Sequence, residues 1–146
     1  MKNARWPEDS CEGGWQETVV IHGVRFHPHP NGGGLVAETA KVAPTAFVGL
    51  FTMVRDHAQV YGNAQVYGNA LVSGSAQVCG DAKVCGSALV YENAQVCENA
   101  LVYENAQVCG NAQVCGNAQV CENAKVCGDA KVSGSAQVSG NAEVSK

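Results

Sequence analysis

Cysteine is the residue type whose number and spacing most suggest chemistry in this chain. Seven of the eight cysteines are separated by multiples of six residues: Cys79, Cys85, Cys97, Cys109, Cys115, Cys121 and Cys127. Thiols at a regular interval could pair as disulfides or bind a thiophilic metal. However, the equivalent positions elsewhere hold Tyr or Ser, each one codon base from Cys, and a straight row of thiols does not converge on the tetrahedron that zinc requires. We therefore expect free thiols and no metal site.

The histidines are the second group with ligand chemistry. His22, His27 and His29 form a His-x4-His-x-His cluster that could bind a metal. They lie in the first 33 residues, and residues 1–34 also hold both tryptophans and the Gly32-Gly33-Gly34 run. We interpret them as loop histidines of a capping segment.

A strict six-residue register determines how all these side chains are positioned. Valine recurs at every sixth residue from Val36 to Val144, and alanine stands two residues before each valine except at Gly34 and Thr52. Residues two apart lie on one face of a strand. Pairs such as Gly62-Asn63 are typical of turns. Each hexad is therefore one short strand and one corner, and three hexads close a coil of 18 residues.

This register predicts an all-β protein with two parts. Residues 34–146 form a parallel β-helix of about six triangular coils, in which residues 18 apart stack. Residues 1–33 form an N-terminal cap, with a strand at residues 18–26, a turn at the following His-Pro-His-Pro, and an apolar lid supplied by Trp6 and Trp15. Such a cap is needed because the open end of a β-helix exposes unpaired backbone groups.

The repeated Val-x-x-x-Ala-x pattern resembles the hexapeptide-repeat superfamily, and the resemblance covers residues 34–146. It implies a left-handed helix, against the usual right-handed rule for parallel strands, and it favours a trimer. The chain departs from the commonest motif because Tyr, Cys or Ser follows the valine, where the family often has Gly.

Enzymes of this superfamily imply one catalytic alternative. Its acyltransferases commonly use a coil histidine as general base, and the only histidine on a coil is His57. That reading would require an acyl-CoA. Those enzymes usually add an inserted loop and a C-terminal helix, which this sequence does not show. The related zinc carbonic anhydrases place three histidines on the coils, and here no histidine follows His57. We therefore expect no cofactor and a non-catalytic interaction or scaffold protein, with the His57 acyltransferase as the alternative.

The outward positions between Ala and Val indicate where a partner would bind. Most hold Gln or Lys, but one face carries Leu35, Met53, Leu71 and Leu89, one coil apart, and a neighbouring face carries Phe47 and Leu101. Contiguous exposed apolar residues usually mark an interface. We predict contact with a protein partner or with other copies of the chain. The alternative is that the N-terminal segment folds back over these side chains.

Charge and the remaining surface features limit the choice of partner further. Glu92, Glu98, Glu104 and Glu122 replace the corner glycine and form an acidic rim that is solvated or meets a basic partner. A net charge of −4 without a basic patch argues against nucleic acid. The chain has no run of about 20 apolar residues for a membrane span and no signal-peptide pattern at its start, so we expect a cytoplasmic protein. The strand edges between Ala136 and Val144 predict end-to-end contact as a second mode of association.

Overall fold

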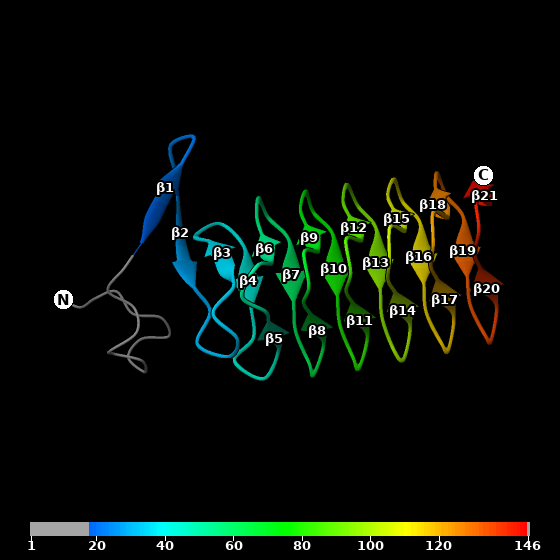
Figure 1. Ribbon diagram of the computed structural model, residues 1–146, viewed down its shortest axis with the longest axis horizontal. Coiled ribbons are helices and arrows are strands. Elements are labelled where there is room, and N and C mark those ends of the chain that lie inside the picture. Colours follow the sequence, from blue (N-terminus) through cyan, green and yellow to red (C-terminus); the bar gives the residue numbers. More distant parts are fainter. Residues whose placement is uncertain (1–17, 146) are drawn as a thin grey trace.

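The computed structural model describes residues 18–145, which form short strands and turns in a row of stacked coils (Figure 1). Face A consists of β3 (Leu35–Ala37), β6 (Met53–Val54), β9 (Leu71–Val72), β12 (Leu89–Val90), β15 (Gln107–Val108), β18 (Lys125–Cys127) and β21 (Glu143–Ser145). Face B consists of β4 (Lys41–Val42), β7 (Gln59–Val60), β10 (Gln77–Val78), β13 (Gln95–Val96), β16 (Gln113–Val114) and β19 (Lys131–Val132). Face C consists of β5 (Phe47–Val48), β8 (Gln65–Val66), β11 (Lys83–Val84), β14 (Leu101–Val102), β17 (Gln119–Val120) and β20 (Gln137–Val138). Residues 18–145 include no helix of the length and apolar character needed to cross a bilayer.

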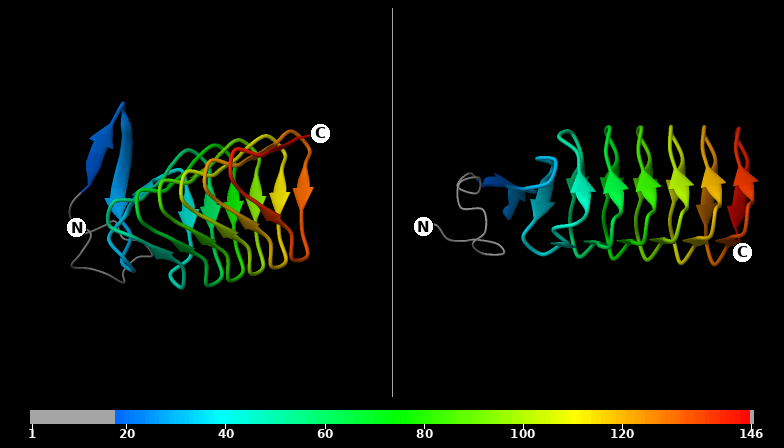
Figure 2. Two further views of the ribbon diagram at one scale, coloured as in Figure 1. Left: turned by 45° about the vertical axis from the view of Figure 1, so that its right-hand side comes forward. Right: turned by 90° about the horizontal axis from the view of Figure 1, so that it is seen from below.

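The strands of each face pair in parallel with a register of 18 residues. In face B, Val78 of β10 pairs with Val60 of β7 on one side and with Val96 of β13 on the other. Figure 2 shows the resulting coils stacked along one axis, with the N-terminal hairpin at one end. The prediction of an all-β parallel β-helix of about six 18-residue coils is confirmed. Its left-handedness stays a prediction.

The interior of the regular coils is built from the small side chains that the repeat supplies. Each repeat valine from Val48 to Val126 is 0% exposed, and the alanines between Ala46 and Ala124 are equally buried. Burying a valine side chain stabilises the fold by about 1.5–3 kcal/mol. Because neighbouring coils supply both walls of every valine site, the stability of one coil depends on the next.

The corners continue the hydrogen-bond ladder between coils. The Gln59 and Tyr61 amides donate to the Ala76 and Val78 carbonyls (2.9 and 3.0 Å), and the corner amide of Asn63 donates to the Gly80 carbonyl (2.9 Å). Asparagine side chains add rungs of their own, since the Asn93 amide donates to Asn111 at 3.3 Å. The corner glycines adopt positive φ, which lets the chain turn without a Cβ clash.

The N-terminal segment differs in one respect from the expected single strand. It forms an antiparallel hairpin of β1 (Val19–Ile21) and β2 (Val24–Pro28). The turn falls at His22 and Gly23, whose φ values of 51° and 80° are those of a two-residue hairpin loop. Strand β2 then pairs antiparallel with β3 and extends face A. The predicted lid residues, Trp6 and Trp15, lie outside the described residues.

The loop after β2 covers the edge of β5. The Ala46 carbonyl accepts hydrogen bonds from His29 Nε2 and Asn31 Nδ2, each at 3.0 Å. The Val48 carbonyl accepts from the Gly34 amide at 2.9 Å, and the Val48 amide donates to the Asn31 carbonyl at 3.0 Å. These contacts replace the preceding coil that every other strand of face C has. His29 is 1% exposed as a result.

Candidate interaction surface

The four predicted apolar residues of face A lie side by side, and we refer to them as the apolar stripe: Leu35, Met53, Leu71 and Leu89. Leu35 pairs with Met53, Met53 with Leu71, and Leu71 with Leu89, so each side chain stands one strand from the next. At about 4.8 Å between strands, the stripe is about 14 Å long. All four are partly exposed. The stripe ends at Leu89, because the column continues through Gln107 and Lys125.

Strand alternation determines which residues form the stripe. In each two-residue strand of face A the valine points inward, as Val90 does at 0% exposure, and the preceding residue points outward. The outward position makes no demand on the core, so its residue type is free to vary. A leucine there is therefore selected by something other than the interior of this solenoid.

An apolar corner was missed in the sequence. Leu50 and Phe51, between β5 and β6, are 66% and 77% exposed and are the most exposed large apolar residues in the described part of the chain. The signal was present, since this hexad has Leu50-Phe51 where most hexads have Gly or Glu followed by Asn, Asp or Ser. The corner lies between face C and face A. It therefore joins the apolar end of one face to that of the other.

The two apolar residues predicted on face C are separated from each other. Phe47 lies next to this corner and packs edge-on against Tyr67, with ring centroids 6.5 Å apart. Leu101 lies three strands farther along face C, beyond Gln65 and Lys83. Phe47 thus belongs with the corner, whereas Leu101 is a single partly exposed leucine among polar neighbours.

The described part of the N-terminal segment lies at the end of the stripe that begins with Leu35. Pro28 of β2 pairs with Leu35, and the hairpin reaches Met53, which lines a cavity together with Phe26. Leu71 and Leu89 lie one and two coils beyond Met53. The hairpin therefore extends the sheet in the plane of face A beside the first stripe residue.

His57 is an exposed corner residue. Its amide donates to the Gly74 carbonyl at 2.9 Å, as the Asn amides do at other corners. The neighbouring Asp56 carboxylate accepts from the Gly74 amide at 3.0 Å and lies 3.7 Å from Arg55 Nε. Asp56 is thus held by Gly74 and Arg55. The aspartate that would orient a catalytic histidine is engaged elsewhere.

The acidic rim consists of carboxylates that hydrogen-bond to the next coil. Glu92, Glu98, Glu104 and Glu122 all have φ near +63°, a conformation that favours glycine. Glu98 Oε1 accepts from the Gly116 amide at 2.6 Å, and Glu104 Oε1 accepts from the Glu122 amide at 2.9 Å. Glu92 and Glu122 make the same contact with Gly110 and Gly140. Each carboxylate therefore satisfies a corner N–H of the coil below it.

The cysteines form columns on the corners, and the structure carries all seven repeat cysteines as thiols. Burial raises the pKa of Cys97 to about 11, and the stacked Cys79 and Cys115 thiols add to this effect. A hydrogen bond to Cys109, together with burial, raises the pKa of Tyr91 to about 12. Cys97 is therefore a protonated, weakly nucleophilic thiol at neutral pH. Within residues 18–145, no group of three or more His, Cys, Asp or Glu side chains is arranged to hold a metal ion.

Comparison with known proteins supports the repeat architecture. A family model described as the YdcK beta solenoid repeat matches residues 64–80, 94–110 and 106–122. These segments lie in the regular coils and cover less than half of the chain. The chain is a β-solenoid. Neither the curated proteins nor the solved structures gave a match.

Proposed function

We propose that this protein is a non-catalytic interaction protein that associates with copies of itself through the apolar stripe, as a member of the hexapeptide-repeat superfamily. The supporting observation is the in-register row of Leu35, Met53, Leu71 and Leu89, all partly exposed, at an outward position that holds Gln or Lys in most hexads. Burying such side chains between molecules contributes about 25 cal/mol for each Å² of apolar surface. A closed assembly about a symmetry axis, with three copies, would bury the stripe of every copy.

Spacing favours a second copy over an unrelated protein. The stripe repeats at the strand separation of a parallel sheet, about 4.8 Å. Another stripe has the same repeat, so about a symmetry axis parallel to the solenoid the apolar side chains of the copies meet level by level along the whole row. The Leu50–Phe51 corner lies just before Met53 in the chain, near the N-terminal end of the stripe. It enlarges the apolar area available to the neighbouring molecule.

Paired charge substitutions test this proposal. Replacing Leu71→Glu and Leu89→Glu places two carboxylates in the stripe without touching the Val and Ala core. The matched control, Gln77→Glu and Gln95→Glu, adds the same charge on the face B strands that follow β9 and β12. Light scattering should show a smaller mass for the leucine variant alone, with circular dichroism unchanged in both. If both variants keep the mass of the parent protein, the stripe is not the interface.

A binding measurement separates this function from acyl transfer. His57 is exposed, and the carboxylate of its neighbour Asp56 is directed through Oδ2 at the Gly74 amide and Arg55, which supports a structural role for this corner. Calorimetry with acetyl-CoA should give no saturable heat. Saturable binding that disappears in a His57→Ala variant would overturn the non-catalytic assignment.

A further inference from the structure

The hairpin and the first two coils line an open cavity that shares only Met53 with the apolar stripe. Its volume is about 250 Å³, slightly below the roughly 300–1,000 Å³ of pockets for drug-sized ligands. Its walls come from β1, β2 and the face A side of the first two coils. The lining residues are Ile21, His22, Val24, Phe26, Thr39, Met53, Arg55 and Asp56.

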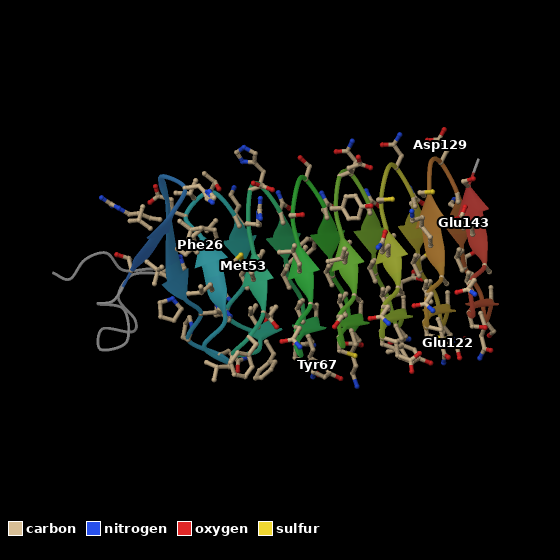
Figure 3. The ribbon with its side chains drawn as sticks, turned by 45° about the horizontal axis from the view of Figure 1, so that its top comes forward. Phe26, Met53, Tyr67, Glu122, Asp129 and Glu143 are labelled. Atoms are coloured by element: carbon tan, nitrogen blue, oxygen red, sulfur yellow. The ribbon has the colours of Figure 1, made fainter. Side chains whose placement is uncertain are left out.

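The inner wall of the cavity is apolar and well ordered by the core. Phe26 is 4% exposed, and Ile21 and Met53 pack against the valine core while remaining partly exposed. Figure 3 shows Phe26 and Met53 next to one another on the hairpin side of the solenoid. A small apolar group placed between them would leave water for an apolar surface that is already in place, so little ordering would be lost on binding.

The outer wall carries two opposite charges on adjacent residues, an arrangement that no other hexad has. Arg55 is the one charged residue that directly follows a repeat valine, where the regular coils have Tyr, Cys or Ser. Asp56 follows it, and the Arg55 and Asp56 side chains are each 47% exposed. Their Nε–Oδ2 separation of 3.7 Å is longer than a direct charged hydrogen bond. The Arg55 guanidinium, together with Asp56 Oδ1, thus retains hydrogen-bonding capacity for a ligand, because the contacts to Gly74 and Arg55 both use Asp56 Oδ2.

The position of this charge pair is fixed by the backbone. The Asp56 carboxylate accepts from the Gly74 amide at 3.0 Å, and the Asp56 carbonyl accepts from the Thr39 hydroxyl. Asp56 also has a φ of 61°, the corner conformation. The carboxylate is therefore held in place, and the Arg55 backbone is held by its amide, which donates to the Val72 carbonyl at 2.9 Å. Such pre-organisation is what a specific polar anchor requires.

The charges decide the class of ligand. A ligand with only a negative charge would be attracted by Arg55 and repelled by Asp56. A ligand with only a positive charge would be attracted by Asp56 and repelled by Arg55. A molecule with a carboxylate and an ammonium group a few ångströms apart satisfies both. We propose that this cavity binds a free α-amino acid with an apolar side chain, its carboxylate on Arg55, its ammonium group on Asp56, and its side chain between Phe26 and Met53.

Methyl NMR of the full chain tests this proposal directly. The chain has two methionines, Met1 and Met53, so a 13C-methyl-methionine sample gives one reporter in the cavity and one at the N-terminus. Titration with L-phenylalanine should shift the Met53 methyl resonance to saturation. Phenylacetate, which lacks the ammonium group, and phenethylamine, which lacks the carboxylate, should each bind at least tenfold more weakly.

Three variants make the result specific. Arg55→Gln and Asp56→Asn should each weaken L-phenylalanine binding at least tenfold; asparagine tolerates positive φ, so the corner is retained. Arg25→Gln is the matched control, because Arg25 lies between Val24 and Phe26 on β2 and points to the opposite side of the hairpin.

The proposal is overturned if the Met53 methyl does not move, if Arg55→Gln binds as the parent does, or if phenylacetate binds equally well. The Leu71→Glu and Leu89→Glu variant should bind L-phenylalanine normally, since neither Leu71 nor Leu89 lines the cavity.

Discussion

Two regions of the solenoid share one interior but differ on the outside. From residue 58 to residue 145, Tyr, Cys or Ser follows each repeat valine, and each corner has Gly or Glu followed by Asn, Asp or Ser. Between residues 34 and 57 the same outer positions include Leu50, Phe51, Arg55 and His57. The valines of both regions fill the interior, and Val54 and Val90, one from each region, are both 0% exposed.

The comparison shows which positions the fold restricts. The interior needs Val and Ala, and the corners need residues that accept positive φ. The outward positions are constrained neither by core packing nor by backbone conformation. If the repeat arose by duplication and nothing else acted on these positions, they would hold the same residue types in every hexad. Departures from the consensus on the outside therefore mark residues with another role, and they concentrate around the hairpin, the Leu50–Phe51 corner and the apolar stripe.

The largest effect on stability should come from the shared interior. Val90→Ala should lower the free energy of unfolding by about 2–3 kcal/mol, through the lost burial and the cavity left behind. Val20→Ala, on the hairpin, should change it by no more than about 0.5 kcal/mol, because Val20 is 61% exposed. Urea denaturation measures both. If the two substitutions lowered the free energy of unfolding equally, the coil interior would not be packed more tightly than the hairpin, and this prediction would be wrong.

A corner glutamate should give an intermediate effect. Glu98→Ala removes the carboxylate that accepts from the Gly116 amide and should cost about 0.5–1.5 kcal/mol. Glu98→Gly loses the same hydrogen bond but relieves a side chain at a φ of 63°, which recovers about 1 kcal/mol. The glycine variant should therefore be the more stable of the two in urea denaturation. Alanine and wild-type proteins of identical stability would mean that the acidic rim has no structural role.

Acidification should loosen the hairpin junction before the regular coils. Burial lowers the pKa of His29 below 6.5, and the same cause lowers the pKa of His27. Within residues 18–145, His29 Nδ1 is buried and has no hydrogen-bond partner, so protonation would leave a buried, charged N–H unpaired. Below about pH 6.5 the opened state binds more protons than the closed state, and stability falls as pH falls.

Hydrogen exchange measures this local effect. Between pH 7.5 and 5.5, after correction for intrinsic rates, protection should fall for amides of β2 and β3 and stay constant for amides of β13. The His29→Gln variant can still donate to the Ala46 carbonyl but does not titrate, so its pH dependence should be weaker. Parallel loss of protection in β2 and β13 would contradict a local origin.

Much of the fold could be predicted because the constraint repeats. The six-residue spacing of Val and Ala determines strand, corner and coil length at once, and the observed register of 18 residues follows from it. The N-terminal segment offers no such repetition. There the strand expected at residues 18–26 is interrupted at His22-Gly23, a two-residue turn whose Gly was the available signal.

The candidate surface was predictable in part for the same reason. The stripe could be located because outward positions 18 residues apart must stack, as Leu71 and Leu89 do. The hydrogen bonds of Glu98 and Asp56 to the next coil could not be predicted, because they depend on side-chain rotamers and on the φ of each corner. The cavity beside Met53 depends on the position of the hairpin relative to face A, and no local sequence pattern specifies that position.

Photo-crosslinking from the stripe tests the central claim most directly. Leu89 of β12 and, as the control, Gln95 of β13 are each replaced by p-benzoylphenylalanine in otherwise wild-type protein. After irradiation, position 89 should crosslink to face A peptides of a second copy and give a species of twice the chain mass or more, whereas position 95 should remain monomeric on a denaturing gel. Crosslinking from position 89 only to residues 1–33 of the same chain, or no crosslink at all, would contradict self-association through the stripe.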